Sequence, residues 1–253
     1  MLPRYKAYEA AYIGVDRMSK TSISITKFDA QRAAQFSEQA RIALAGYDAC
    51  HELAACILSA AMSGREARIL VVGAGGSGGE IIACSKLETA WQFMALDPAE
   101  AMLEAAKDSV REAGVTNFID WKIGTLADLE SEERFDAATL MGVLHHLPGN
   151  DEKAAILSQI QAHLKPAAPL ILACNHFAYA SQPLMLKAWA NRWRMHGASS
   201  SEIESKLAKI LEAADPPAGE SAVIDLLAQA GFETPLRFFS SLYWGAWTSR
   251  RGG

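Results

Sequence analysis

Residues 67–80, ARILVVGAGGSGGE, decide the fold of this 253-residue chain. The apolar run at 69–72 predicts a strand that other elements cover on both faces. The glycines after it let the backbone turn sharply and come close to a ligand where a Cβ would collide. Glu80 and the apolar residues behind it predict the start of a helix. A strand, a glycine turn and a helix N-terminus together form a binding place for nucleotide-like ligands.

The glycines also fit a known spacing. Gly73, Gly75 and Gly78 match G-x-G-x-x-G, and Asp97 follows Gly73 by 24 residues, at the end of the next apolar run. An acid in that position can accept hydrogen bonds from both hydroxyls of a ribose. This geometry serves NAD and S-adenosylmethionine (SAM) equally, so the glycine turn alone leaves both cofactors open.

Composition excludes several classes of protein. The net charge is −5, with 24 basic and 29 acidic residues, which argues against a nucleic acid partner. The four cysteines show neither C-x-x-C nor Cys/His metal-ligand spacing, so we expect reduced thiols and no metal site. The charged N-terminus does not resemble a signal peptide, and no window holds the ~20 apolar residues of a membrane helix. We therefore expect a cytoplasmic protein without a membrane segment.

Strands and helices alternate in the middle of the chain. Strands are predicted at 67–72, 91–96, 117–122, 134–140 and 169–174, with helices at 79–88, 99–113 and 151–164. This alternation is typical of βαβ units and a doubly wound, mostly parallel α/β sheet. Ligands bind such sheets outside the carboxyl ends of the strands, where Gly73, Asp97, Thr125 and Met141 lie.

Helices are predicted on both sides of this core. Before it come 30–45, with Asp29 as its cap, and 49–62, capped by Asp48, while Tyr5, Tyr8 and Tyr12 give residues 1–26 a packing face or a lid. After it come helices 183–195, 199–211 and 222–230. The β-rich runs 234–239 and 242–248 are joined by Ser240-Ser241, which predicts an antiparallel hairpin.

Three further stretches resemble motifs of the class I SAM-dependent methyltransferases. They are 96–106 (LDPAEAMLEAA), 135–147 (FDAATLMGVLHHL) and 164–172 (LKPAAPLIL). The resemblance covers nearly the whole chain and implies SAM rather than NAD as the cofactor. It implies a single Rossmann-like methyltransferase domain over 1–253 with a seven-stranded sheet, divided into a helical lid (1–65), a SAM-binding core (66–175), a helical cap (176–232) and a terminal hairpin (233–253).

The resemblance also implies roles for individual residues. Gly73, Ala74 and Gly75 pass beneath the methionine part of SAM, Asp97 holds the ribose, Pro98 and Met102 flank the adenine, and Thr125 and Leu126 meet its edge. Tyr47, Met141, His146 and Arg194 face the transferring group, with His146 and Arg194 as the catalytic candidates. Two positions depart from the family pattern. Val71 stands where an acid normally orients the glycine turn and the amine, and Thr125 stands where an acid normally holds the adenine.

The flanks resemble a subgroup that includes carboxy-S-adenosylmethionine synthase. Tyr47 and Arg194 match residues that contact the cofactor there, while Ala198, Met141 and the His145-His146 pair depart from it. We therefore expect methyl transfer from SAM to a small molecule, with a synthase-like enzyme or a non-catalytic SAM-binding protein as alternatives. A homodimer is compatible with this interpretation. The acceptor, the methylated atom and the need for a general base are left open.

Overall fold

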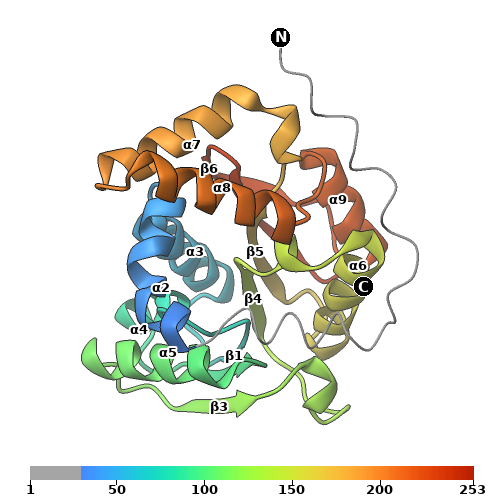
Figure 1. The fold of residues 1–253 in the computed structure, drawn as a ribbon. Coiled ribbons are helices and arrows are strands. Elements are labelled where there is room, and N and C mark those ends of the chain that lie inside the picture. The colour runs from blue at the N-terminus through green and yellow to red at the C-terminus, as the bar shows by residue number, and fades with distance from the viewer. Residues whose placement is uncertain (1–29) are drawn as a thin grey trace.

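The computed structural model describes residues 30–253, with side chains from Phe36 onward (Figure 1). The predicted tyrosine face at Tyr5, Tyr8 and Tyr12 and the cap at Asp29 lie outside the described residues, as does the first part of the predicted lid.

A single seven-stranded sheet forms the centre of the molecule, in the order β3-β2-β1-β4-β5-β7-β6. Strands β1 to β5 pair in parallel, and β7 runs antiparallel to both β5 and β6. The strands are β1 (Arg68–Val72), β2 (Gln92–Asp97), β3 (Ile119–Ile123), β4 (Ala137–Met141), β5 (Pro169–Asn175), β6 (Leu236–Ser241) and β7 (Trp244–Arg250). The predicted fold class, a mostly parallel α/β sheet with an antiparallel C-terminal pair, is confirmed.

Helices cover both faces of the sheet (Figure 1). The α-helices are α2 (Ala30–Ala43), α3 (Tyr47–Met62), α4 (Gly79–Leu87), α5 (Glu100–Glu112), α6 (Gly149–His163), α7 (Pro183–Met195), α8 (Ser200–Ala213) and α9 (Glu220–Gln229), and the short 3₁₀ turns are η1 (Leu126–Asp128), η2 (Leu144–His146) and η3 (Tyr179–Ser181). One face packs against α3, α4 and α5, and the other against α6 and α9. The sheet is thus doubly wound, as predicted.

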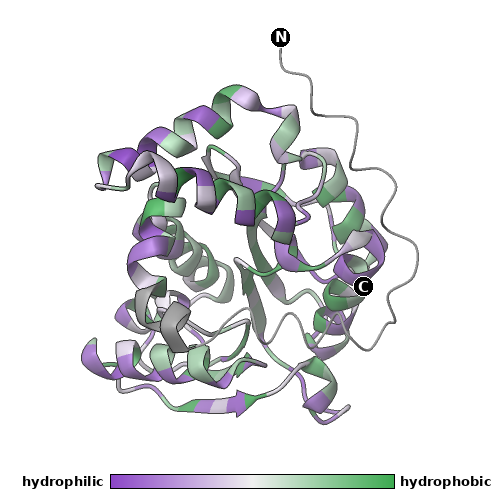
Figure 2. Cartoon of the chain, viewed as in Figure 1, coloured by the Kyte–Doolittle hydropathy of each residue, from purple (hydrophilic) through white to green (hydrophobic). Residues whose placement is uncertain are grey.

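The two faces come from the alternation of side chains along each strand. On β1, Leu70 and Val72 join the core beneath α6 and α9, while Ile69 and Val71 join the core beneath α3 and α4. Figure 2 shows hydrophobic residues along β4 and β5, whereas the edge strand β3 is mostly hydrophilic. The central strands are therefore held by apolar burial on both sides, which fixes the ends from which the site is built.

Two predicted boundaries are wrong in an informative way. Asp48 does not cap the second helix, because α3 begins at Tyr47 and Gly46, at φ +81°, occupies the cap position. Asp48 lies in the first turn and accepts a hydrogen bond from the Arg41 side chain at 2.8 Å. This places Tyr47 on the helix.

The hairpin turn also differs from the prediction. Ser240 and Ser241 belong to β6, and Leu242 and Tyr243 make the turn, with Leu242 at φ +51°. The Tyr243 ring is fully buried, and its one hydroxyl proton lies within reach of the carbonyls of Gln182 at 2.8 Å and Tyr179 at 3.1 Å. Burial of this ring accounts for a turn that Ser-Ser chemistry does not predict.

Helices α7 and α8 lie across the end of the sheet to which β4 and β5 point (Figure 1). Trp189 and Trp193 of α7 are buried in a cluster with Tyr179 and Tyr243. Between residues 30 and 253, no single helix is long and apolar enough to cross a membrane, and one pair bent by 87° has the required length and composition only when taken together.

Candidate active site

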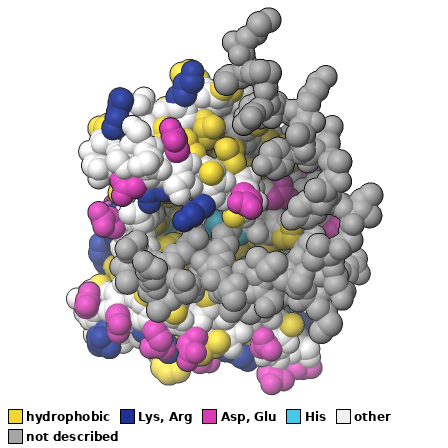
Figure 3. All heavy atoms as spheres, viewed as in Figure 1, with side chains coloured by type: hydrophobic (Ala, Val, Ile, Leu, Met, Phe, Trp, Pro, Cys, Tyr) yellow, Lys and Arg dark blue, Asp and Glu magenta, His cyan; other side chains and the backbone are white. Residues whose placement is uncertain are grey.

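A cavity of about 860 Å³ opens at the carboxyl ends of the strands. Its floor is the glycine turn after β1 and the segment after β4, one wall comes from α2 and α3, and its roof comes from α7 and α8. Figure 3 shows this side of the molecule, with a histidine side chain visible near the centre beside basic and hydrophobic side chains. Pockets that bind cofactors and small ligands have volumes of about 300–1,000 Å³. This single cavity lies near the upper end of that range, so it has room for a cofactor and part of an acceptor.

The glycine turn is tied to the neighbouring strand and helix by its own backbone. The amides of Gly73 and Ala74 donate to the Leu96 carbonyl at 2.8 and 3.0 Å, and the Gly76 amide donates to the Met102 carbonyl at 2.8 Å. A Cβ on Gly75 would lie 2.6 Å from both the Asp97 carboxylate and the Met102 Cβ. The close approach of these elements therefore requires glycine at position 75.

Asp97 joins the glycine turn to the next helix. Its carboxylate accepts hydrogen bonds from the amides of Gly75 at 3.0 Å and Ala99 at 2.8 Å. Burial raises the pKa of Asp97 above its ordinary value, and these two amides offset part of that rise. A carboxylate has about four acceptor positions, so Asp97 keeps acceptor capacity for ribose hydroxyls. The free acceptor positions of Asp97, beside the glycine turn, are therefore suited to bind the ribose of a nucleoside ligand.

The residues predicted around the adenine do not line the cavity. Pro98 is exposed, Met102 is buried against Phe36 of α2, and Leu126 is buried in η1. Thr125 is exposed and caps η1, donating to Asp128 from its amide at 2.7 Å and its hydroxyl at 3.1 Å. Asp128 therefore supports the turn that follows β3.

The two histidines stand on η2, after β4. The rings of His145 and His146 lie 4.2 Å apart between centroids, and the edge of the Trp244 ring meets His145 at 5.1 Å. His145 is buried, whereas His146 is partly exposed, and both line the cavity with Met141. This end of the cavity therefore carries two imidazole rings, the side chains suited to accept a proton near neutral pH.

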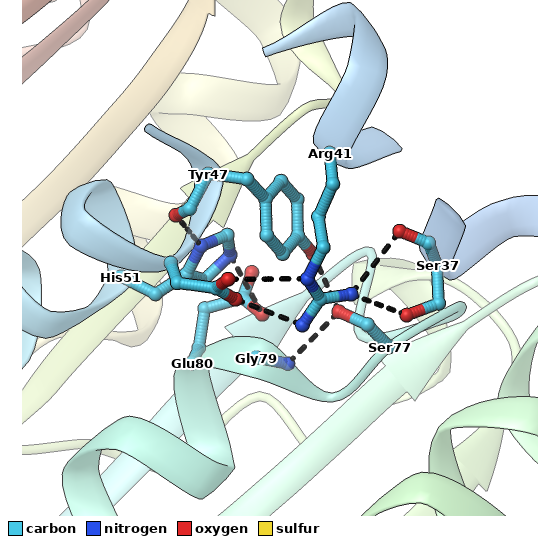
Figure 4. A network of polar contacts seen from close by, with 8 residues as sticks. Ser37, Arg41, Tyr47, His51, Ser77, Gly79 and Glu80 are labelled. Atoms are coloured by element: carbon cyan, nitrogen blue, oxygen red, sulfur yellow. Dashed lines mark hydrogen bonds and ion pairs between the residues drawn. The ribbon is translucent and has the colours of Figure 1, made fainter. Parts of the chain in front are cut away.

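A polar network not predicted from the sequence links α3 to the glycine turn (Figure 4). The hydroxyls of Tyr47 and Ser77 lie 2.5 Å apart, and Ser77 also accepts from the Gly79 amide at 3.2 Å. His51 lies one helical turn after Tyr47 and contacts its carbonyl at 2.8 Å, while its other ring nitrogen lies 3.7 Å from Glu80. Burial, and then the charge of Glu80, raise the pKa of Tyr47.

The tryptophan and arginine residues of α7 hold α2 in place. The last carbonyls of a helix lack partners within the helix. Here Trp189 donates to the Ala43 carbonyl at 2.7 Å, and Arg192 donates to the carbonyls of Ile42 and Arg41 at 2.6 and 2.8 Å. Arg194 lies on another side of α7, is exposed and does not line the cavity.

The structure brings together only some of the predicted site residues. Those that line the cavity are Tyr47, Gly73, Gly75, Met141 and His146. Those that do not are Ala74, Asp97, Pro98, Met102, Thr125, Leu126 and Arg194. The sequence analysis missed Ser77, His51 and Glu80, although the four-residue spacing of Tyr47 and His51 and the place of Glu80 at a helix start were visible in it.

Comparison with known proteins agrees with this geometry. Residues 70–170 match the sequence model of a family described as a methyltransferase domain. A search of curated proteins finds no match.

Solved structures share the fold. A candidate O-methyltransferase from Nostoc punctiforme PCC 73102 has a TM-score of 0.62 at 15% identity over 87% of this chain and 59% of its own. An O-methyltransferase family 2 protein from Planctomyces limnophilus DSM 3776, solved with apigenin, has a TM-score of 0.63 at 15% identity over 94% and 62%. Human N-acetylserotonin methyltransferase, solved with SAM, has a TM-score of 0.50 at 16% identity over 74% and 48%.

The chain spans less than two thirds of the length of each of these structures. At such identities the likeness shows a common fold, the seven-stranded Rossmann-like fold of the methyltransferases.

Proposed function

We propose that this chain is a SAM-dependent methyltransferase whose acceptor is a small molecule. One observation carries the proposal. The glycine turn after β1 is bonded to Asp97 at the end of β2, beside a cavity of about 860 Å³, in a segment that matches a methyltransferase domain. The related fold that was solved with SAM supports this choice of cofactor.

The chain's own residues divide into a cofactor end and an acceptor end. Gly73 and Gly75 let the backbone pass close beneath the methionine part, with Ala74 between them, and Asp97 accepts the ribose hydroxyls. The adenine then extends past Asp97, beyond the lining of the cavity, toward Pro98, Met102, Thr125 and Leu126. When bound, SAM supplies the methyl group for an in-line displacement.

At the acceptor end the residues orient the acceptor and exclude water. Tyr179, Trp189, Trp193 and Trp244 give this end apolar, aromatic walls. Alignment of the reacting atoms by such walls is worth several kcal/mol of the barrier, roughly 7–11 in the best intramolecular systems. Tyr47 and Met141 lie where the two ends meet.

We propose a hydroxyl group as the site of methylation and His146 as the residue that takes its proton. Two of the similar structures are described as O-methyltransferases, and one of these was solved with apigenin, a polyphenol. His146 lines the cavity, and an imidazole is the side chain that most often serves as a general base. Arg194 gets no role in this mechanism because it is exposed outside the cavity, and the synthase-like alternative loses its anion partner for the same reason.

Calorimetric titration with SAM and with NAD tests the cofactor, and transfer of a labelled methyl group to a panel of hydroxylated aromatic compounds tests the reaction. We expect SAM to bind, NAD not to bind, and label to appear on at least one phenol. His146→Ala should retain SAM binding and lose most transfer to that acceptor. Binding of NAD without binding of SAM contradicts the proposal.

A further inference from the structure

Glu80 carries a carboxylate that the fold buries at the edge of the cavity. It stands in the first turn of α4, directly after the glycine turn, and is only 8% exposed. It lines the cavity together with Gly73 and Gly75. The helix N-terminus favours a negative charge, but by less than the cost of burying a carboxylate that lacks a partner. A cation bound next to Glu80 would therefore stabilise its buried carboxylate.

His51 does not supply that cation in its neutral form. The Tyr47 carbonyl can only accept, so the Nδ1 atom that lies 2.8 Å from it carries the proton. The Nε2 atom of neutral His51 is then a bare acceptor, 3.7 Å from the Glu80 carboxylate. Among the described residues, no hydrogen bond reaches the carboxylate of Glu80. With His51 neutral, the contact that Figure 4 marks between His51 and Glu80 joins two acceptors.

The charge of Glu80 also acts on the apolar surroundings behind the cavity. Burial, followed by the charge of Glu80, raises the pKa of Cys50 and of Cys84 to about 12. Both thiols are therefore neutral at physiological pH, so they add no second negative charge beside the carboxylate.

Within residues 36–253, no other acid lines this end of the cavity. The end of β1 carries Val71 and Val72, which are buried in the two cores. Asp97 does not line the cavity and already accepts from two amides. Glu212 lines the cavity but is exposed on α8, on its roof.

We propose that Glu80 binds the ammonium group of the cofactor's methionine part and that His51 accepts a second hydrogen bond from the same group. This inference rests on the proposed function. A nitrogen about 2.8 Å from both acceptor atoms fits the 3.7 Å gap between them. An ammonium offers three donors, so one remains for a further partner. Helix α4 then supplies the acid that the end of β1 lacks.

Calorimetric titration of three ligands into three proteins tests this inference. The ligands are SAM, S-adenosylhomocysteine, which has the ammonium but no sulfonium charge, and 5′-methylthioadenosine, which has neither. The proteins are the unsubstituted chain, Glu80→Gln and Glu100→Gln. Glu100 is the matched control, because it lies in the first turn of α5 as Glu80 does in α4 but is exposed.

We expect Glu80→Gln to weaken SAM and S-adenosylhomocysteine alike by roughly tenfold or more, and to leave 5′-methylthioadenosine unchanged. Glu100→Gln should change none of the three. Without ligand, the unfolding temperature of Glu80→Gln should equal or exceed that of the unsubstituted chain, because a buried charge without a partner has been removed.

Each other result overturns the inference in a recognisable way. A loss for SAM alone assigns Glu80 to the sulfonium, and an equal loss for all three ligands assigns it a structural role. Unchanged affinities remove Glu80 from the site. If the unsubstituted chain binds none of the three ligands, the proposed function fails, and the inference fails with it.

Discussion

Asp97 uses only half of its hydrogen-bonding capacity within the protein. Two backbone amides occupy it, and the remaining acceptor positions are those proposed to hold the ribose. Asp97→Asn replaces one carboxylate oxygen by an NH₂ group, which cannot accept from a backbone amide. One of the two hydrogen bonds to the Gly75 and Ala99 amides is therefore weakened or lost, and the charged acceptor for the ribose is removed. We expect SAM binding to weaken by about tenfold or more, measured by calorimetry at neutral pH.

The raised pKa of Asp97 adds a pH dependence with a definite sign. The folded protein keeps this proton to higher pH than the unfolded chain, whose pKa is close to 3.8. The folded state therefore binds more protons just above pH 3.8, and this contribution to stability decreases as the pH rises through the raised folded pKa. SAM affinity should decrease as the pH falls through the same window, because ribose hydroxyls lose an ionised acceptor. Asp97→Asn should show neither change at these pH values.

At Gly75 the prediction concerns steric overlap with neighbouring side chains rather than charge. A methyl group there would lie 2.6 Å from Met102 and from Asp97, within a turn that the backbone holds in place. Gly75→Ala should cost about 1–3 kcal/mol of unfolding free energy and weaken SAM binding as well. Gly219→Ala is the control, because that glycine is extended and its added Cβ meets nothing within 4 Å. Equal stability of the two variants in urea titrations is evidence against a tight turn.

Local patterns account for the residues that the sequence analysis found, and tertiary placement for those it missed. Gly75 and Asp97 could be predicted because the glycine turn after one strand and the acid at the end of the next both lie within one βαβ unit. His51 and Glu80 meet only because α3 packs on α4, which their separation in sequence does not reveal. Arg192 and Arg194 look alike in sequence, and only the position of the α2 carbonyls distinguishes them.

Among the elements, the turn that carries the histidines is fixed from the far side by a buried lysine. Lys153 of α6 is 1% exposed and donates to the carbonyls of Leu147 at 2.8 Å and Gly149 at 2.9 Å, and to the Asp215 carboxylate at 3.1 Å. The Asp215 amide donates to the His145 carbonyl at 2.9 Å. The chain that leaves α8 is therefore joined to η2.

Lys153→Met should remove these three hydrogen bonds while keeping an apolar stem, although the Asp215 carboxylate still accepts from the Gly149 amide at 2.6 Å. We expect a loss of about 1–3 kcal/mol in unfolding free energy, measured by urea titration. Lys165→Met is the matched control, because Lys165 pairs with Asp136 at 2.7 Å but is half exposed, and such pairs contribute about 0–1 kcal/mol. If the two variants lose the same amount, the buried lysine does not hold η2.

Element boundaries were predictable where packing and local chemistry agree. Ser199 caps α8 through the capping box with Glu202, as the predicted start at 199 implies. The hairpin turn was misplaced because the buried Tyr243 ring, rather than the serines, sets it. The sequence analysis also predicted the doubly wound sheet and its antiparallel end. These two features follow from long apolar runs and from one short link between strands, so they do not depend on the exact position of any single residue.

At the scale of the whole molecule, the sheet and its roof differ in how firmly they are held. Strands β4 and β5 are buried along their full length, whereas α8 has no buried residue. Helix α8 reaches α2 through Lys206, which donates to Gln39 at 2.7 Å, and both residues line the cavity. Helix α8, the part of the roof without a buried residue, should open at a low free energy, and a ligand-binding cavity needs such an element.

Hydrogen exchange measured by mass spectrometry tests this difference. In the ligand-free protein, α8 should exchange much faster than β4 and β5. S-adenosylhomocysteine should protect residues 73–80 and the start of α3 and leave α8 fast, because α8 covers the acceptor end. An acceptor added with it should slow exchange in α8.

Lys206→Met should speed α8 exchange in the ligand-free protein, whereas Lys209→Met on the same helix should change it little. Slow exchange of α8 without ligand would mean that the roof belongs to the rigid core, and that the acceptor must enter by another route.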